Sequence, residues 1–268
     1  MRVALVQMCS TDDLAANLKA AAGFVGEAAD RGAAFVLLPE MFAYLRREGQ
    51  AFPHAQQLDG EIVGSLREWA RRHGVRLLGG SFAERIEAQE RVFNTSVLID
   101  PQGEIEAVYR KIHLFDVQLG ADGNFRESAS IAPGSDVVVA ETPIGGIGLS
   151  VCYDLRFPEL YRRLVQGGAE LLLVPSAFTF PTGAAHWEVL CRARAIENQC
   201  YLIAPNQTGR SPHGFADFGN SMIVDPWGCV LARAGEDEGI ITAEVDGTYL
   251  ARVRRELPAL GHARLPSS

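Results

Sequence analysis

No stretch of this 268-residue chain approaches the run of about 20 apolar residues that a membrane-spanning helix needs. The N-terminal string MRVALVQMCS has a short apolar core and then turns polar, which is typical of a strand and not of a signal peptide. An excess of basic residues is also missing, because 25 Lys and Arg face 33 Asp and Glu and give a net charge of −8. Proteins that bind nucleic acid or anionic membranes more often carry a basic patch. We therefore expect neither nucleic acid nor a membrane as a partner.

Paired cysteines and metal-ligand spacings are absent as well. The five cysteines are widely spaced, odd in number and contain no CxxC motif: Cys9, Cys152, Cys191, Cys200 and Cys229. This pattern predicts neither a disulfide framework nor a zinc site. The six histidines are scattered without the spacing of metal ligands. Free thiols in a reducing cytoplasm are the simplest interpretation.

The composition that remains is that of an ordinary globular protein, with 47% hydrophobic and 22% charged residues. Two strings repeat at one offset. HGVRLLGGS begins at 73 and NQCYLIAPN at 198, while SVLIDPQGEI begins at 96 and SMIVDPWGCV at 221, so both pairs are 125 residues apart. A constant offset indicates an internal duplication. Paired halves of this kind predict an α/β fold, a four-layer α-β-β-α sandwich, in a single domain over 1–268.

Each half is predicted to run strand, helix, strand, helix, strand, hairpin. In the first half we expect strands over 2–8, 33–38 and 75–78, a helix capped by Asp12 or Asp13 and ending near Asp30, a helix over 61–73, and a hairpin of 91–100 with 104–111. From about Ala251 the chain is rich in arginine. By default this is a solvated basic tail. An arm that docks on the body or on another subunit is the alternative.

The string GGIGLSVCYDLRFPEL at 145–160 combines a buried strand, a cysteine and the first turn of a helix. Cys152 ends the strand, and Pro158 is typical of a first helical position. Backbone N–H groups and the helix dipole at such a place favour a thiolate, so Cys152 is a candidate nucleophile. A buried cysteine used as a small hydrophobe is the alternative.

Two charged residues also stand at predicted strand ends, Glu40 after Leu37-Leu38-Pro39 and Lys111 after Tyr109-Arg110. A glutamate can act as the base for a thiol, and a lysine can stabilise an oxyanion as it develops. Together with Cys152 they fit acyl transfer through a thioester. Taken singly, a glutamate or lysine is more often a solvated surface group.

Three ordered strings carry a resemblance to the nitrilase, or carbon–nitrogen hydrolase, superfamily: LLPE at 37–40, YRKIHLFD at 109–116 and VCYDLRFPEL at 151–160. The resemblance runs from VALVQM near the start to RVRRELP near the end. It implies an α-β-β-α sandwich and a catalytic triad of Glu40, Lys111 and Cys152. It also implies hydrolysis of a non-peptide C–N bond with neither a metal nor an organic cofactor.

The resemblance extends to residues around the triad. Arg126-Glu127-Ser128 followed by Pro133-Gly134 is similar to a family string with a second glutamate, so Glu127 is expected to position substrate and hold Lys111. The backbone N–H of Tyr153 is the implied second oxyanion donor. His113 invites a Cys–His dyad interpretation, but no accompanying Asn or Asp string supports it, and a packed or capping histidine is favoured.

Substrate contacts are implied for the segment after the second strand of the second half. Family likeness places Phe178, Thr179, Thr182 and Arg194 around the active site, while Trp187 fits core packing at least as well as a pocket wall. Arg156 follows the nucleophile by four residues. In a related branch an arginine at the matching position is associated with the substrate carboxylate. A structural ion pair with Glu159 or another acid is the alternative.

The strings at 175–209 and 219–228 are similar to small amidases of metabolite repair. We expect a cytoplasmic amidase for a small carboxylate-bearing amide, with deaminated glutathione as the first candidate substrate. An omega-amidase acting on alpha-ketoglutaramate and an N-carbamoyl amino acid hydrolase are the alternatives, and a catalytically silent binding or scaffold protein is the alternative of a different class. The loop 43–55 matches neither amidase branch and leaves the substrate open.

The resemblance also implies assembly. Family members pack back to back through the helix after the nucleophile. This places 159–165 at a two-fold interface, with Leu160, Tyr161 and Leu164 on one apolar face. We expect a homodimer or a multiple of it.

Overall fold

The computed structural model describes residues 1–47, 49–119, 124–210, 212 and 214–264. Its first part contains β1 (Arg2–Gln7), α1 (Leu14–Asp30), β2 (Phe35–Leu37), α2 (Glu61–His73), β3 (Arg76–Leu78), β4 (Phe82–Arg85), β5 (Val92–Ile99), β6 (Ile105–Arg110), β7 (Asp116–Gln118), β8 (Asn124–Arg126) and the 3-10 helix η2 (Glu127–Ala129). The second part contains β9 (Val139–Thr142), β10 (Gly145–Leu149), the 3-10 helix η3 (Cys152–Arg156), α3 (Pro158–Gln166), β11 (Ala169–Leu173), α4 (Phe180–Asn198), β12 (Tyr201–Ala204), β13 (Thr208–Arg210), β14 (Ala216–Phe218), β15 (Met222–Val224) and β16 (Val230–Arg233). The chain then continues through β17 (Gly239–Glu244), α5 (Gly247–Glu256) and the 3-10 helix η4 (Ala259–His262).

Apart from β4, which has no counterpart in the second sheet, two large sheets share one strand order. The first runs β17-β1-β2-β3-β5-β4, with β6 also paired to β5, and the second runs β16-β15-β12-β11-β10-β9. In each, three parallel strands are followed by an antiparallel hairpin: β1-β2-β3 with β5-β6, and β10-β11-β12 with β15-β16. The predicted order of elements in each half is confirmed.

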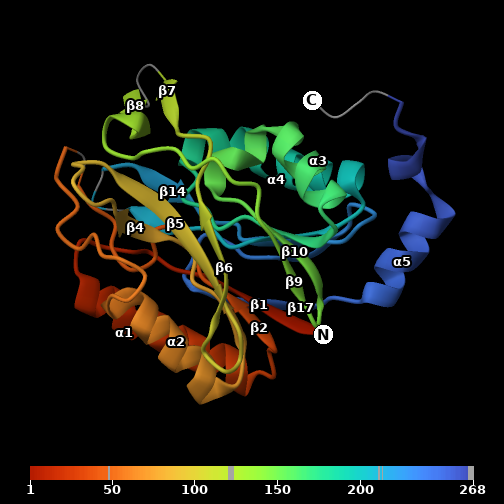
Figure 1. Ribbon diagram of the computed structural model, residues 1–268, viewed down its shortest axis with the longest axis horizontal. Helices are drawn as coiled ribbons and strands as arrows, with labels where there is room; N and C mark the ends of the chain where they lie inside the picture. The colour runs from red at the N-terminus through yellow and green to blue at the C-terminus, as the bar shows by residue number, and fades with distance from the viewer. Residues whose placement is uncertain (48, 120–123, 211, 213, 265–268) are drawn as a thin grey trace.

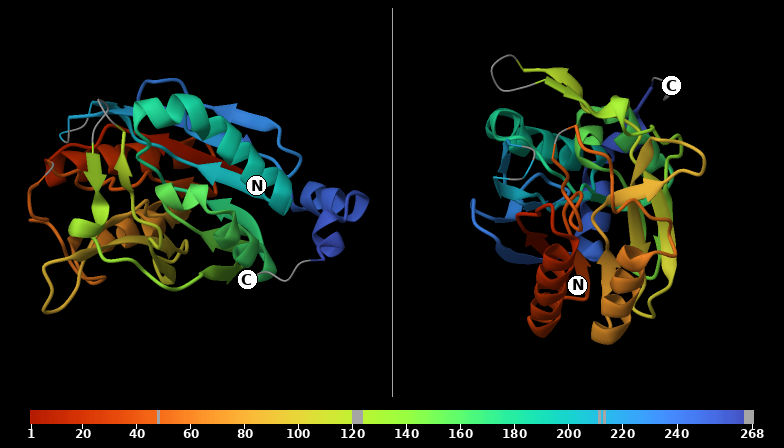
Figure 2. Two further views of the ribbon diagram at one scale, coloured as in Figure 1. Left: turned by 90° about the horizontal axis from the view of Figure 1, so that it is seen from above. Right: turned by 90° about the vertical axis from the view of Figure 1, so that its left-hand side faces the viewer.

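The sheets pack face to face between two pairs of helices. Figures 1 and 2 show α1 and α2 side by side on one outer face, and Figure 1 shows α3 and α4 on the opposite side of the molecule. The side chains of β1 show that its sheet is covered on both faces, because they alternate between two buried sides. Val3 and Leu5 belong to the core shared with the second sheet, whereas Ala4 and Val6 belong to the core under α1 and α2. The predicted α-β-β-α sandwich is confirmed.

Local signals set the helix boundaries that the sequence predicts. The carboxylate of Asp13 caps α1 by accepting from the N–H of Ala16. Helix α2 ends at Gly74, whose φ of 64° is a left-handed conformation that glycine adopts without strain. Pro158 is the first residue of α3 and fixes the exit of the chain from the nucleophile segment.

Two expectations about the surface are wrong. Leu160, Tyr161 and Leu164 face the molecule's own core and are buried, so they cannot form an interface with a second subunit. The segment from Ala251 is not a solvated tail at its start. It completes α5, in which Val253 is buried and Arg254 donates to the carbonyl oxygens of Gln199 and Ala169. The docking-arm alternative therefore describes this helix. No helix in the described ranges is long and apolar enough to cross a membrane.

Candidate active site

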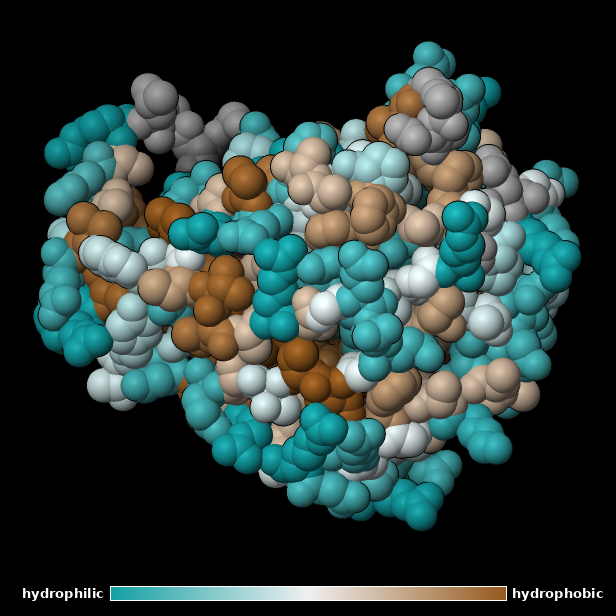
Figure 3. Space-filling model, turned by 180° about the vertical axis from the view of Figure 1, so that it is seen from behind, coloured by the Kyte–Doolittle hydropathy of each residue, from teal (hydrophilic) through white to brown (hydrophobic). Residues whose placement is uncertain are grey.

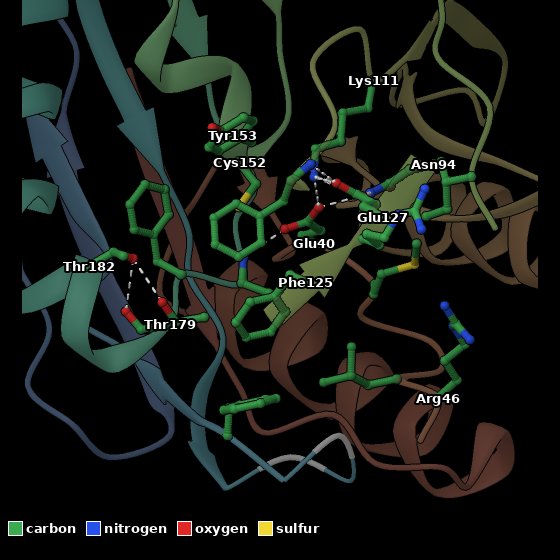
Figure 4. Close-up of a pocket in the computed structure, with 18 of the residues that line it drawn as sticks. Glu40, Arg46, Asn94, Lys111, Phe125, Glu127, Cys152, Tyr153, Thr179 and Thr182 are labelled. Carbon is green, nitrogen blue, oxygen red and sulfur yellow. Dashed lines mark hydrogen bonds and ion pairs between the residues drawn. The ribbon is translucent and has the colours of Figure 1, made fainter. Parts of the chain in front are cut away.

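A cavity of about 210 Å³ opens where strand ends of both sheets converge. Glu40 follows β2 after Leu38-Pro39, Lys111 directly follows β6, and Cys152 follows β10 by three residues. All three line the cavity, and Figure 4 shows their side chains pointing toward one another. The three residues that the sequence placed at separate strand ends are therefore brought together.

Glu40 is held by donors from both halves of the molecule. Its Oε1 accepts from Asn94 Nδ2 at 2.8 Å and from Lys111 Nζ at 3.0 Å, while its Oε2 accepts from the backbone N–H of Ala177 at 2.9 Å. The side chain is 6% exposed. A carboxylate with this many fixed donors has one orientation, which aims it at the thiol of Cys152.

Lys111 is a buried cation between two carboxylates. Its Nζ lies 3.0 Å from Glu40 Oε1 and 2.9 Å from Glu127 Oε2. Burial by itself lowers the pKa of this ammonium, but the carboxylates of Glu127 and Glu40 outweigh it and hold the pKa of Lys111 well above its usual value. Lys111 thus stays charged and can stabilise developing negative charge.

Glu127 lies where the sequence predicted, beside Lys111. Its Oε1 and Oε2 accept from Lys111 Nζ at 3.0 and 2.9 Å, and Oε2 also accepts from the N–H of Phe115 at 2.6 Å. These bonds fix the ammonium beside Glu40, and Asn94 Nδ2, which donates to Glu40, also donates to Glu127 Oε1 at 3.5 Å.

Cys152 sits in a strained backbone conformation, with a φ of 49°. A non-glycine residue in this region has a steric cost that the surrounding structure must overcome, and such residues cluster at active sites. Burial, and next the carboxylate of Glu40, raises the pKa of the Cys152 thiol well above its usual value, against the opposing effect of Lys111. Burial therefore outweighs the effect of the helix N-terminus, which by itself favours a thiolate. The five-residue η3 does not offset burial, and the resting group is a thiol that needs a base.

Asp154 is the anchor of the nucleophile segment, and sequence reasoning did not single it out. Its fully buried carboxylate accepts from the N–H of Val151, the hydroxyl of Tyr109 and the N–H of His113. The His113 ring bonds to the same carboxylate through Nδ1 at 2.7 Å and stacks on Phe157. His113 is a packed residue, as predicted, and Asp154 ties the Cys152 turn to the chain around Lys111.

Most predicted substrate contacts line the cavity. Tyr153, Phe178, Thr179 and Thr182 all do, and Figure 4 shows the Thr179 and Thr182 hydroxyls bonded to each other at the cavity side. Tyr153 N–H belongs to the first turn of η3, where N–H groups have no acceptor within the helix.

The two predicted arginines differ. Arg156 lines the cavity, with its guanidinium 5.7 Å from the Tyr153 ring centroid and 5.3 Å from that of Phe178. In the described part of the chain, the Arg156 guanidinium bonds to His186 Nδ1 at 3.3 Å and forms no ion pair with Glu159. Arg194 does not line the cavity. It is buried on α4 and donates to the carbonyl of Leu155 and to Glu197, so it supports η3 from behind instead of contacting substrate.

Asn94, Arg46 and Arg126 also line the cavity but were not predicted as site residues. Asn94 interrupts the apolar run of β5 with a buried amide, a signal that could have marked it. Arg46 belongs to the loop 43–55, which borders the cavity and also contributes Tyr44, Leu45 and Phe52 to its lining. A loop offers no periodicity from which the direction of a side chain can be predicted. In the part of the chain with described positions, no group of three or more His, Cys, Asp or Glu is arranged to hold a metal ion.

Comparison with known proteins agrees with this geometry. The family model described as "Carbon-nitrogen hydrolase" matches residues 2–255. Deaminated glutathione amidase from Homo sapiens is 45% identical over 267 residues, which cover 98% of this chain and 82% of that protein. The protein of the same name from Synechocystis sp. is 42% identical over 262 residues, covering 97% of this chain and 96% of that protein. The crystal structure of Saccharomyces cerevisiae Nit3, a member of branch 10 of the nitrilase superfamily, aligns with a TM-score of 0.87 at 33% identity, covering 96% of this chain and 94% of that one.

A sandwich of two duplicated halves, together with these relatives, defines a hydrolase of the nitrilase superfamily. The chain belongs to the carbon–nitrogen hydrolase family. It is accordingly a hydrolase of carbon–nitrogen bonds, of the amidase kind.

Proposed function

We propose that this protein hydrolyses a small carboxylate-bearing amide through a thioester on Cys152, with deaminated glutathione as its substrate. The observation that carries the mechanism is the buried contact of Glu40 with both Lys111 and the Cys152 thiol. A buried thiol with a raised pKa reacts only when a base accepts its proton as it attacks. Glu40 is the carboxylate oriented to do so.

In the first half-reaction Glu40 takes the proton of Cys152 Sγ, and the sulfur attacks the amide carbon. The carbonyl oxygen gains negative charge, which Lys111 Nζ and the N–H of Tyr153 stabilise. Collapse of this intermediate breaks the C–N bond, and Glu40 returns its proton to the leaving nitrogen. A thioester on Cys152 and a free amine result.

The second half-reaction releases the acid. Glu40 takes a proton from water, and the hydroxyl attacks the thioester carbon. When the C–S bond breaks, the sulfur recovers that proton from Glu40, and the carboxylic acid leaves. Every proton therefore passes through one carboxylate, which fits the three fixed donors on Glu40 that hold it in place.

The proposed substrate follows from the curated relatives and from the cations of the cavity. Two relatives named deaminated glutathione amidase cover nearly the whole chain at 42% and 45% identity. Arg156 lines the cavity close to the nucleophile, and a guanidinium can hold a carboxylate with two parallel hydrogen bonds. We assign it the carboxylate on the acyl part of the substrate.

Assembly as a homodimer and a cytoplasmic location are part of the proposal. All five cysteines are free, which fits a reducing compartment. Exposed apolar side chains lie on α4 and on the hairpin that packs beside it: Val189, Ile196, Trp227 and Leu231. Figure 3 shows hydrophobic side chains interrupting the hydrophilic surface of the back face. Sedimentation at micromolar concentration should give a dimer or a multiple of it; a fully active monomer would contradict the assembly.

The substrate is tested by measuring amine or ammonia release from deaminated glutathione, alpha-ketoglutaramate, an N-carbamoyl amino acid and a nitrile. We expect the highest kcat/KM for deaminated glutathione and, after rapid quenching, an acyl adduct on the peptide that contains Cys152. A higher kcat/KM for another compound would reassign the substrate. A protein that binds these compounds with no turnover and no adduct would be a binding protein instead of an enzyme.

A further inference from the structure

The charge of the cavity differs from that of the protein. The chain carries a net charge of −8, yet among the described residues that line the cavity four are cationic and two, Glu40 and Glu127, carry carboxylates. Lys111 is engaged with both carboxylates. The other cationic residues of the described lining are arginines: Arg46, Arg126 and Arg156. More than one arginine in a small cavity of an acidic protein is typical of a ligand with more than one negative group.

Two of these arginines stand on different walls. Arg156 contacts the rings of Tyr153 and Phe178, on the wall that also carries Thr179 and Thr182. Figure 4 shows Arg46 on the side of the cavity opposite the two threonines. The chain order gives the same division, because Arg156 follows Cys152 by four residues and Arg46 follows Glu40 by six. Arg156 and Arg46 therefore belong to different segments of the cavity wall, one that follows the nucleophile in sequence and one that follows the base.

The fold holds Arg46 in the cavity wall. Its Nη2 donates to Ser130 Oγ at 2.7 Å, its Nη1 donates to the carbonyl of Gln50, and its guanidinium stacks over the Phe52 ring at 4.4 Å. Directly after Glu40 the backbone of Met41 has a φ of 53°, a conformation that L-residues rarely adopt and that turns the chain into this loop. A guanidinium fixed in this way loses little conformational entropy when it binds a carboxylate.

We propose that Arg46 is a specificity-determining residue that binds a second carboxylate, on the part of the substrate that leaves as the amine. The inference rests on the proposed amidase function and deepens it. The preferred substrate class is then a dianionic amide with its scissile bond between two carboxylates. Deaminated glutathione has this form, with a carboxylate at each end. Alpha-ketoglutaramate, whose leaving group is ammonia, has no second carboxylate for Arg46 to bind.

The test compares two substrates that differ only in the second charge: deaminated glutathione, and the same compound with its glycine carboxylate converted to a neutral carboxamide. Arg46→Gln should lower kcat/KM on the dianion about 10- to 100-fold, mainly through KM, and on the carboxamide less than about 3-fold. In the Cys152→Ala background the Kd for the dianion should weaken by the same factor. Arg47→Gln is the matched control, because Arg47 pairs with Asp12 and does not line the cavity.

Each failure has its own signature. If Arg46→Gln lowers kcat/KM equally for both substrates, the side chain only supports the loop. The inference is then overturned, while the amidase function stands. The same holds if Arg126→Gln, at an exposed residue on β8, shows the charge-specific loss instead. If the unaltered protein hydrolyses neither compound but Cys152→Ala binds the dianion in an Arg46-dependent way, the carboxylate site stands and the proposed reaction fails. No hydrolysis and no binding overturns both.

Discussion

The two halves of the molecule share a topology but contribute different chemistry. Leu37 in FVLLPE corresponds to Leu173 in LLLVPS, so Glu40 corresponds to Ser176. The strand registers pair Leu5 with Leu37 and Leu149 with Leu173. Three residues beyond these partners stand Met8 in the first half and Cys152 in the second.

The difference shows why a duplicated fold has one composite site instead of two. Met8 is 1% exposed and packs in the core, and the Ser176 hydroxyl donates to the carbonyl of Val174. At the working site the first half supplies the charged groups Glu40 and Lys111. The second half supplies the thiol of Cys152 and the N–H of Ala177. The site therefore exists only when the halves have docked.

Removal of the thiol should have the largest effect, because the second half supplies the nucleophile of the composite site. Cys152→Ala should lower kcat about 10⁴-fold or more and abolish the acyl adduct, because each cycle begins with attack by this sulfur. Circular dichroism and urea unfolding should show a folded protein. Cys229→Ala, at an exposed thiol, is the control and should keep full turnover. Undiminished activity of folded Cys152→Ala would falsify the mechanism.

The sequence predicted the sandwich because its signals are periodic and repeated. Buried strands, the Asp13 cap, the stop at Gly74 and the constant offset of 125 residues between position 73 and position 198 are local patterns, and each has a direct structural consequence. The strand-end positions of Glu40 and Cys152 could be predicted in the same way. Their convergence could not, since it depends on how two sheets pack.

The predictions that were wrong concern burial, which no local sequence pattern determines. Leu160 and its neighbours on α3 are apolar on one face, but the sequence does not say whether that face meets its own core or another subunit. Burial also raises the pKa of Cys152, although its position before a helix suggested a lower one. Arg194 lies in the segment around the site, yet it points behind η3 and bonds to the Leu155 carbonyl.

Exchange of the base compares corresponding positions in the two halves. Glu40→Gln should lower kcat about 10²- to 10⁴-fold, since the amide keeps the shape but cannot accept the thiol proton. Ser176→Ala, the same position in the second half, should change kcat less than about 3-fold and cost about 1 kcal/mol of unfolding free energy through the lost bond to Val174. Steady-state kinetics measures kcat for both variants, and urea unfolding measures the free energy of unfolding. Similar kinetic losses in both variants would show that the halves are not divided in this way.

The second half also supplies a charge, at Arg156. Arg156→Met should lower kcat/KM about 30- to 1000-fold on carboxylate-bearing amides and spare a neutral short amide of similar size. The measurement uses deaminated glutathione, alpha-ketoglutaramate and the neutral amide. The kcat/KM for both anionic compounds should fall, because each has the acyl carboxylate assigned to Arg156. Equal losses on all three would make Arg156 a structural residue.

The smallest expected effect concerns a buried thiol that takes no part in the reaction. Cys200 corresponds to Val75 at the offset of 125 residues from 75 to 200, and both backbone N–H groups bond to the end of the preceding helix, to Ala195 and Ala70. Burial raises the pKa of Cys200 from 9.0 to about 11, against the opposing charge of Arg254. A raised pKa favours the neutral thiol in the folded state. Its contribution to stability is therefore intact below pH 9 and is lost as the pH rises toward 11.

Cys200→Val, which introduces the residue of the first half, removes this titration. Between pH 8 and pH 10.5 the unaltered protein should lose about 2 kcal/mol more unfolding free energy than Cys200→Val does. Urea unfolding at both pH values measures the difference, and other groups that titrate in this range cancel because both proteins contain them. If the two proteins lose the same amount, Cys200 titrates in the folded state as it does in the unfolded chain. Cys200 and the corresponding Val75 would then differ only in side-chain shape and not in a titration linked to folding.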